Sequence, residues 1–380
     1  MSPENGRPRE NHEPPAPDDE TRDRAHEAPD EKHDPDSPTD LTKRSWTYVL
    51  RKTVREFGKD QCTDIAAALT FFAVLAMFPA LIALLSIIGL VGESQQTVDT
   101  LVGILETLGG GSVADTLEPV LNDLANSGSA GVALIAGLAA ALWSASAYTS
   151  AFARAMNRIY QVDEGRPFWK FRPLMILLTA VLLLMAAVVL IGLVLSGPVA
   201  QAVGDSIGLS STVMSVWSIA KWPVILLVVA IMVALLYWAT PNLKQPKFRW
   251  LSIGAATAIL VWILASAGFG FYIANFSNYE QTYGALAGVI VFLLWVWLTN
   301  VALLFGAELD AELERGRELQ SGIAAEERIQ LPPRDTKKSE KDAKKRQQDV
   351  DDGRAIRLAH GKEDAEDSSG ATDRTPEKER

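Results

Sequence analysis

The chain has 380 residues, of which 48% are hydrophobic and 22% are charged, and its formal net charge is -10. Its single cysteine, Cys62, excludes an internal disulfide and any multi-cysteine zinc or iron–sulfur site. The four histidines stand at positions 12, 26, 33 and 360, which leaves the body of the chain without an imidazole. We therefore expect no metal, no cofactor and no histidine-based catalysis.

Most of the acidity lies at the start of the chain. Residues 1–40 contain 13 acidic and five basic side chains, together with eight prolines and very few apolar residues. Such a composition cannot bury a core, so it predicts a disordered acidic tail. Residues 41–319 are nearly neutral and form the predicted membrane domain.

Six stretches of the membrane domain are uncharged and rich in Leu, Ile, Val, Ala and Phe. A helix needs roughly 20 apolar residues to cross a hydrocarbon core of about 30 Å, and each stretch is long enough. The sequence thus predicts an all-α, polytopic membrane protein with six transmembrane helices. The predicted spans are about 65–91, 131–153, 173–200, 222–242, 250–276 and 282–307.

The basic residues of the connecting segments predict the orientation. Sixteen Lys and Arg residues flank the spans on one side, whereas the other side has only Lys221. Because basic residues near a span are retained in the cytoplasm, we expect both termini to be cytoplasmic. The start of the chain lacks the short apolar core of a cleavable signal peptide, so span one is expected to act as the insertion signal.

The connection between spans one and two has a pattern of its own. Residues 92–130 contain six acidic and no basic side chains, and apolar residues recur at helical spacing in 98–108 and 113–124. This predicts two short amphipathic extracytoplasmic helices. They would pack over the outer ends of the bundle or, alternatively, form a lid or vestibule wall.

Residues 320–380 mix both signs of charge without a helical apolar stripe, which predicts a second disordered cytoplasmic tail. Its basic cluster at 341–346 could touch anionic lipid or RNA. The interspersed acidic residues favour a solvated tail instead, and we expect no nucleic-acid partner.

Charged residues gather where the spans end on the cytoplasmic side. Arg154 and Arg158 share one helical face with Asn157 between them. They are either ordinary orientation signals paired with acidic neighbours, or a site that holds the phosphate or carboxylate of a lipid headgroup. The candidate ion-pair or coupling partners are Asp64, Glu308 and Asp310.

Two residues inside the spans also stand out. Pro79 removes a backbone hydrogen bond and is expected to kink span one, either to shape a cavity or for packing. Asn300 is the lone carboxamide well inside the apolar part of span six. It should bond another helix or water in a cavity, and we favour the structural role.

Four segments carry a family resemblance: "DIAAALTFFAVLAMFPAL" at 64–81, "AFARAMNRIYQV" at 151–162, "LLYWATPN" at 235–242 and "FYIANFSNYEQTYGALAGVIVFLLWVWLTNVALLFGAELDAEL" at 271–313. Over roughly 45–318 the chain resembles the YihY/virulence factor BrkB family of bacterial inner-membrane proteins. The resemblance implies six helices in the bacterial inner membrane. Members of that family have been linked to envelope integrity and proposed to move lipids, and the family long carried the label of ribonuclease BN.

The resulting hypothesis is a translocator or export factor for a lipid or another amphiphilic envelope substrate, with membrane lipids as its partners. The alternative is a non-transporting scaffold that binds other envelope proteins or itself. An enzyme is disfavoured because the sequence shows no nucleophile–base pair, and a metal-dependent ribonuclease needs clustered ligands that the body lacks. A transporter should have an opening beside spans one, two and six, with Arg154 or Arg158 at its mouth.

Overall fold

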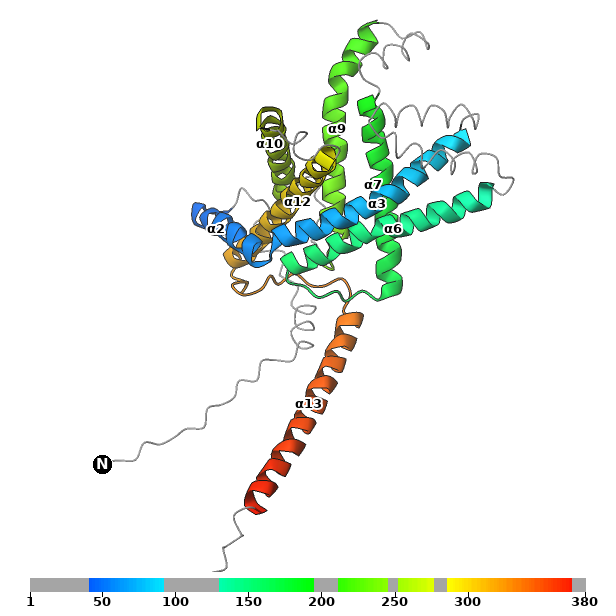
Figure 1. Cartoon of the computed structure of the whole chain (residues 1–380). Helices are drawn as coiled ribbons and strands as arrows, with labels where there is room; N and C mark the ends of the chain where they lie inside the picture. The colour runs from blue at the N-terminus through cyan, green and yellow to red at the C-terminus, as the bar shows by residue number, and fades with distance from the viewer. Residues whose placement is uncertain (1–40, 92–129, 195–210, 245–251, 277–285, 371–380) are drawn as a thin grey trace, which may run out of the picture.

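The computed structural model describes residues 41–91, 130–194, 211–244, 252–276 and 286–370 (Figure 1). Within these residues the regular structure is helical, as the sequence predicts, and one isolated antiparallel bridge pairs Leu243 with Pro333. The predictions for the tail 1–40 and for the two amphipathic helices fall outside the described residues. The helices are α2 (Lys43–Lys59), α3 (Cys62–Val91), α6 (Ala130–Ile159), α7 (Phe168–Val194), α9 (Ser211–Ala239), α10 (Ile253–Phe276), α12 (Leu286–Gln320) and α13 (Lys337–Gly370).

Four of the described helices are long and apolar enough to cross a membrane. They contain Phe168–Leu190, Ser215–Ala239, Ile253–Asn275 and Ala287–Gln320, and the bent pair Lys43–Lys59 with Cys62–Met77 makes a fifth if it is one span. The predicted spans 65–91 and 131–153 coincide with α3 and α6, parts of which have no described side chains. Four to five spans are therefore supported, whereas the count of six and the orientation of the termini remain predictions.

A sharp break separates α2 from α3. Thr42 caps α2 by accepting a hydrogen bond from the backbone N–H of Ser45, and the helix ends at Lys59. Gln61 then adopts a left-handed backbone with φ of 56°, and α3 starts again at Cys62. The two helices meet at an angle of 60°. The break turns α2 to run alongside α12.

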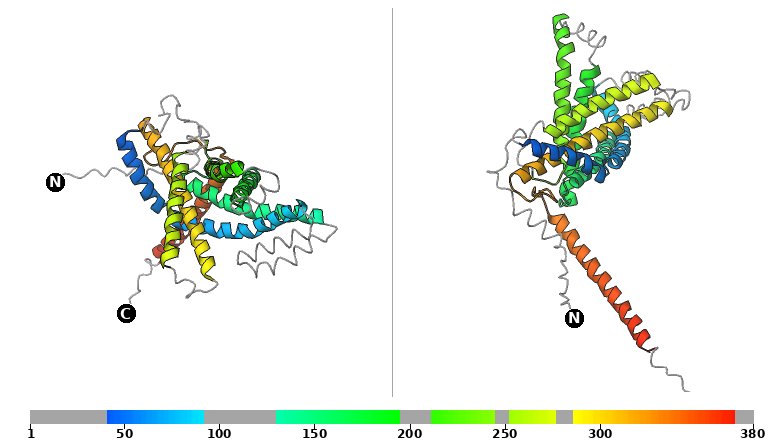
Figure 2. Two further views of the ribbon diagram at one scale, coloured as in Figure 1. Left: turned by 90° about the horizontal axis from the view of Figure 1, so that it is seen from above. Right: turned by 90° about the vertical axis from the view of Figure 1, so that its left-hand side faces the viewer.

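The core lies where the helices converge. Helices α3 and α6 run side by side, as do α7 with α9 and α10 with α12, and the pairs diverge toward their other end (Figures 1 and 2). The buried side chains come from the C-terminal parts of α6, α9 and α12 and from the N-terminal parts of α3, α7 and α10. The diverging parts expose mainly apolar side chains, as expected for surfaces that face lipid.

Close packing at this end depends on flat rings and small residues. Phe152 is fully buried and stacks between Tyr148 and Tyr237, with ring centroids 6.3 Å apart on each side. Gly254 of α10 faces Gly306 of α12 so closely that a Cβ at either position would collide with the other residue's carbonyl oxygen. Only glycine therefore permits this helix crossing.

The segment that follows α12 differs from the predicted disordered tail. Ala325, Ile329 and Leu331 are buried against the bundle, and α13 begins at Lys337. Helix α13 points away from the bundle at its converging end (Figure 2). Its side chains between 341 and 359 are almost all exposed. The packed part of the chain thus extends about 16 residues beyond the predicted boundary at 319. A few apolar residues of this segment pack against the bundle, which the average composition of the tail does not reveal.

Candidate functional site

An open pocket of about 360 Å³ lies at the converging end of the bundle. It brings together the three predicted headgroup residues with a third arginine, Arg328, from the segment after α12. Helix α6 contributes the predicted residues, and the connection from α6 to α7 forms the floor. The lining consists of Arg154, Asn157, Arg158, Gln161, Val162, Asp163, Glu164 and Arg328. We call it the arginine pocket.

The two predicted arginines are exposed and lightly held. Arg154 donates to the carbonyl oxygen of Ser150 over 3.2 Å, and its guanidinium lies 5.9 Å from the centre of the Phe72 ring. Arg158 lies 3.7 Å from Asp60, not beside the predicted Asp64, which is exposed. Each arginine is exposed and its contacts are long, so both guanidinium groups keep donors for a ligand.

A buried carboxamide pair fixes the pocket floor. Asn157 donates to Glu164 over 2.9 Å and accepts a hydrogen bond from the backbone N–H of Asn242 over 2.8 Å. The Asn242 side chain is fully buried and donates to the carbonyl oxygens of Asp163 and Asp335. Asn157 therefore has a framework role, and the exposed side chains of Arg154 and Arg158 beside it present donors to the pocket.

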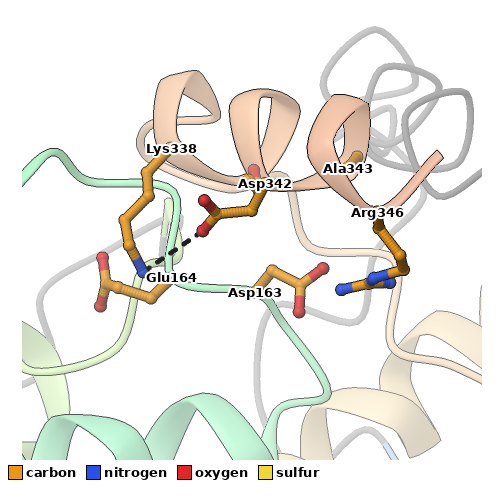
Figure 3. Close-up of a pocket in the computed structure, with 7 residues that line it drawn as sticks. Asp163, Glu164, Lys338, Asp342, Ala343 and Arg346 are labelled. Carbon is orange, nitrogen blue, oxygen red and sulfur yellow. Dashed lines mark ion pairs between the residues drawn. The ribbon is translucent and has the colours of Figure 1, made fainter. Parts of the chain in front are cut away.

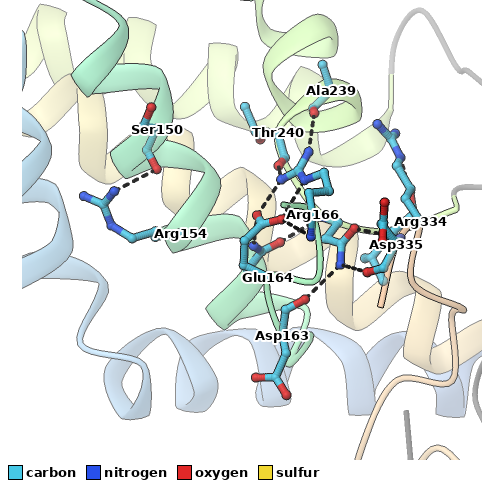
Figure 4. Close-up of polar contacts among 12 residues, drawn as sticks. Ser150, Arg154, Asp163, Glu164, Arg166, Ala239, Thr240, Arg334 and Asp335 are labelled. Carbon is cyan, nitrogen blue, oxygen red and sulfur yellow. Dashed lines mark hydrogen bonds and ion pairs between the residues drawn. The ribbon is translucent and has the colours of Figure 1, made fainter. Parts of the chain in front are cut away.

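Arg166 ties the pocket floor to the end of α9 (Figure 4). Its guanidinium makes two hydrogen bonds of 2.7 Å to the Glu164 carboxylate and also donates to the carbonyl oxygens of Ala239 and Thr240. Those carbonyls lie at the negative end of the helix and lack helical partners, so a buried cation satisfies them. Glu164 is thereby neutralised, and the net charge of the arginine pocket is positive.

The C-terminal segment docks on the same frame. Arg334 donates to the carbonyl oxygens of Leu243 and Trp238, and Asp335 forms an ion pair with Lys170. Burial raises the pKa of Asp335, but the hydrogen bond from Lys170 and the nearby backbone N–H of Lys337 outweigh it and hold that pKa below its usual value.

A glycine allows the same segment to approach the pocket floor. A Cβ on Gly165 would overlap the carbonyl group of Asp335, and the Gly165 carbonyl oxygen accepts the backbone N–H of Lys338 over 2.8 Å. The start of α13 is therefore fixed directly beneath the arginine pocket.

Arg328 reaches the pocket through the turn that ends α6. It donates to the carbonyl oxygen of Gln161 over 3.3 Å, and Gln161 has a left-handed backbone with φ of 54°. The fully buried Arg315 of α12 donates to the Gln161 side chain and to the carbonyl oxygen of Ala325. The turn and the C-terminal segment are thus held together, which brings Arg328 into the same lining as Arg154 and Arg158.

A smaller pocket of about 120 Å³ lies between the floor and α13 (Figure 3). Asp163 and Glu164 line one side, and Lys338, Asp342 and Arg346 of α13 line the other. Lys338 and Asp342 form an ion pair at 3.7 Å. Because acidic and basic groups alternate here, this pocket offers an anion much less than the arginine pocket does.

The predicted acidic partners separate into different surroundings. Asp310 accepts hydrogen bonds from Ser252 and from the backbone N–H of Gly254, so it caps the start of α10. Glu308 is 1% exposed and accepts the S–H of Cys62 over 3.7 Å. Neither carboxylate lines the arginine pocket.

The residues predicted inside the spans also have separate positions. Asn300 accepts a hydrogen bond from the Tyr148 hydroxyl over 2.9 Å and donates to Thr70 over 3.2 Å, which links α12 to α6 and α3. For Pro79, only its place within α3 belongs to the described structure. The predicted kink stays a prediction.

Several residues in and beside the pocket could not be predicted from the sequence. Arg328 lies in the predicted tail, where the nearby apolar residues Ile329 and Leu331 are a local sign of a packed segment. Asn242 belongs to the "LLYWATPN" segment, one of the four that carry the family resemblance. The resemblance does not indicate which role Asn242 has. Asp60 and Asp64 look equivalent in sequence, but Asp60 caps the end of α2 whereas Asp64 lies in the first turn of α3, on the other side of the break at Gln61.

The comparisons with known proteins agree on one family. The family model described as Virulence factor BrkB matches residues 53–330, which includes Arg328. The ribonuclease-like protein YfkH of Bacillus subtilis is 33% identical over 254 residues, covering 67% of this chain and 90% of its own length. Two UPF0761 membrane proteins, from Alkalilimnicola ehrlichii and Alcanivorax borkumensis, are 32% and 30% identical over 68% and 67% of this chain. The matches span 56% and 58% of those two relatives. No solved structure matches the chain.

Proposed function

Because this chain belongs to the virulence factor BrkB family of membrane proteins, we propose that it is a bacterial inner-membrane translocator for an anionic amphiphile of the envelope. The substrate class is a lipid or lipid-like molecule with a phosphate or carboxylate headgroup. In this proposal the arginine pocket faces the cytoplasm and receives that headgroup.

One observation carries the proposal: three arginines from distant parts of the chain line one open pocket. A guanidinium presents a planar fork of donors that matches the oxygens of a phosphate or carboxylate. Of the two acidic lining residues, Glu164 is already paired with Arg166. Unneutralised positive charge at the end of a helix bundle attracts anions from solution and from a membrane surface.

The surroundings of the pocket favour an amphiphile over a small ion. Arg154 and Arg158 lie near the end of α6, from which apolar exposed surfaces of α3 and α7 continue in the direction of the membrane. A molecule with a charged head and acyl chains could place its head among the arginines and its chains along these surfaces. A small inorganic ion would gain nothing from the apolar part.

The proposal is tested by reconstituting the full chain in liposomes that contain headgroup-labelled lipids. The test variant is R154Q/R158Q, which removes two charges from one helical face. The control is R51Q/R55Q, an exposed pair at the same spacing on α2 that does not line the pocket. We expect the test variant to lose most of the labelled-lipid movement and the control to retain it.

Native mass spectrometry of the purified protein supplies the binding half of the same test. The wild type and R51Q/R55Q should carry co-purified anionic lipid, and R154Q/R158Q should carry much less. Equal lipid binding and equal movement in all three proteins would rule out the arginine pocket as the headgroup site.

A scaffold that assembles envelope proteins is the second candidate, and α13 favours it. This helix extends away from the bundle and exposes nearly all its side chains between 341 and 359, which is the form of an arm that binds a partner (Figure 1). A chain that ends at residue 336 separates the two functions. Lipid movement that survives the deletion favours the translocator, whereas intact folding with lost envelope integrity favours the scaffold.

The name of YfkH raises ribonuclease activity as a third reading. The described residues contain no group of three or more His, Cys, Asp or Glu side chains that could hold a metal ion. Incubating the reconstituted protein with labelled RNA tests this reading directly. Cleavage that follows the protein through purification and disappears in R154Q/R158Q would replace the lipid proposal.

A further inference from the structure

A group of carboxyl side chains lies at the break between α2 and α3, next to the arginine pocket. Asp60 ends α2, and its side chain is 14% exposed. Glu308 of α12 packs against the same break and is 1% exposed. Glu56 and Glu312 stand nearby on α2 and α12. Four acidic groups are thus brought together by one helix break.

Three of these carboxyl groups have cationic partners. Glu56 pairs with Lys52 and Lys59, and Glu312 pairs with the buried Arg315 over 3.0 Å. Asp60 has Arg158 at 3.7 Å.

Glu308 is the exception. One of its oxygens accepts the weak S–H donor of Cys62, and the other, Oε2, receives no hydrogen bond in the described structure. An unpaired carboxylate at such depth is strongly unfavourable, whereas a protonated carboxyl group is not.

The remaining contact of Glu308 identifies where a proton would lie. Its side chain meets the carboxyl group of Asp60 within hydrogen-bonding reach. Two ionised carboxylates are both acceptors and repel each other, so this contact is a hydrogen bond only when one of them carries a proton. Both the contact between Asp60 and Glu308 and the lack of a hydrogen bond at Glu308 Oε2 are therefore explained by a bound proton.

We propose that Asp60 and Glu308 share one dissociable proton, and that this proton and an anion in the arginine pocket favour each other's binding through Arg158. This inference rests on the proposed function for the anion, but the shared proton stands without it. Arg158 connects the two sites because it lines the pocket and contacts both Asp60 and the side chain of Gln61.

The sign of the coupling follows from charge. Without the proton the pair has a charge of about -2, which holds Arg158 at Asp60 and repels an anion in the pocket. With the proton the charge is about -1, so Arg158 is held less firmly and can turn to the anion. The other charged groups that face the pair keep their own partners in both states: Glu56, Lys59 and Glu312.

Reciprocity makes this arrangement a co-binding site. If protonation strengthens anion binding, anion binding must strengthen protonation by the same factor. A translocator with such a site would carry a proton with each anion in the same direction. Because protons run down their gradient into the cytoplasm, the gradient across the bacterial inner membrane would then drive the anion toward the cytoplasmic face.

The shared proton is tested first, without any ligand. Infrared spectra of the full-length protein in lipid nanodiscs report protonated carboxylic acids through their C=O stretch. We expect such a band in the wild type at neutral pH, its loss in E308Q, its shift in D60N because the hydrogen-bonding neighbour of Glu308 changes, and its unchanged retention in D64N. Asp64 is the matched control because it is an exposed carboxylate one turn further along the chain.

The coupling is tested by the pH dependence of binding, with short-chain phosphatidic acid as the probe. One linked proton changes the affinity by up to about tenfold per pH unit, and we expect the wild type and D64N to bind more tightly as pH falls. E308Q imitates the protonated state, so its affinity should stay at the acidic level over the same pH range.

Each failure is separately recognisable. A wild-type spectrum without the band, or a band that D60N and E308Q leave unchanged, overturns the shared proton while the proposed function stands. A band together with equal pH dependence in the wild type and E308Q overturns the coupling. A band without probe binding at any pH overturns the proposed function, and the coupling with it, but not the shared proton. A wild-type spectrum without the band decides against the shared proton even if a variant does not fold.

Discussion

The backbone N–H of Asn242 donates a hydrogen bond of 2.8 Å to the side-chain oxygen of Asn157, although 85 residues separate the two in sequence. Both residues are buried, and each also bonds the connection between α6 and α7. The floor of the arginine pocket is therefore one hydrogen-bonded unit built from three parts of the chain. Removing either carboxamide leaves hydrogen-bonding groups without a partner in the other parts of this unit.

We expect N242A to lower the free energy of unfolding by about 1–3 kcal/mol, because three buried hydrogen bonds lose their side-chain partner. The measurement is the thermal unfolding midpoint of the protein in detergent. N275A is the control, since Asn275 is exposed and donates only to the carbonyl oxygen of Phe271 within its own helix. Equal shifts in the two variants would contradict the framework role.

R328Q should weaken binding of short-chain phosphatidic acid roughly tenfold, the effect of losing one charge-assisted hydrogen bond. R346Q serves as the control, because Arg346 lines the smaller pocket and not the arginine pocket. Titration of both purified variants gives the dissociation constants. The idea fails if R346Q weakens binding as much as R328Q does.

A chain that ends at residue 336 should unfold close to the wild-type temperature, whereas a chain that ends at Gln320 should be clearly less stable. The shorter chain loses buried Ile329 and Leu331, each of which contributes about 1.5–3 kcal/mol. Thermal unfolding of the two truncated proteins compares them directly. Similar stability of both would mean that residues 321–336 are dispensable for the fold.

The attachment of the C-terminal segment should depend on acid pH. The pKa of Asp335 is lower in the folded protein than in the unfolded chain, so its contribution is fully present above about pH 4. That contribution is lost as the pH falls through the lower folded value. Hydrogen exchange at the start of α13 should rise in this acid range in the wild type, and D335N should show the fast exchange already at neutral pH.

The Tyr148–Asn300 hydrogen bond should contribute about 0.6 kcal/mol, with an upper end near 1.7 kcal/mol, as polar contacts between membrane helices do. A double-mutant cycle with Y148F and N300A isolates this term from the packing losses. Unfolding in denaturing detergent provides the four free energies. A coupling of zero would indicate that Asn300 depends on Thr70 alone.

Hydropathy was sufficient to locate the long apolar helices, because a long uncharged stretch leaves few alternatives to a helix that crosses or fills an apolar layer. It did not reveal the charged helices α2 and α13. The break between α2 and α3 could not be predicted from hydropathy. Its direction depends on the left-handed backbone of Gln61, a residue with no special preference for that conformation. A helix continuing through this point would put Asp60 and Asp64 on one face, and the break separates them.

Only part of the lining and frame of the candidate site could be predicted from the sequence. Arg154, Asn157 and Arg158 follow from helical spacing, which is a local property of the sequence. Arg328, Asn242 and Arg334 reach the same place through contacts across 70 residues or more, and no local pattern encodes such contacts. The composition of residues 320–380 also concealed the packed segment, since three buried apolar residues have little effect on an average over 61 residues.

The helices are joined at one end and separate toward the other, which gives them the mechanics of levers. A helix of 27 residues, such as α7, is about 40 Å long. A rotation of about 5° at the joined end would move its far end by about 3.5 Å, comparable with the width of an acyl chain. Small rearrangements among the buried polar groups are thus amplified with distance, and pairs of spin labels at the far ends of α7 and α10 would register them most sensitively.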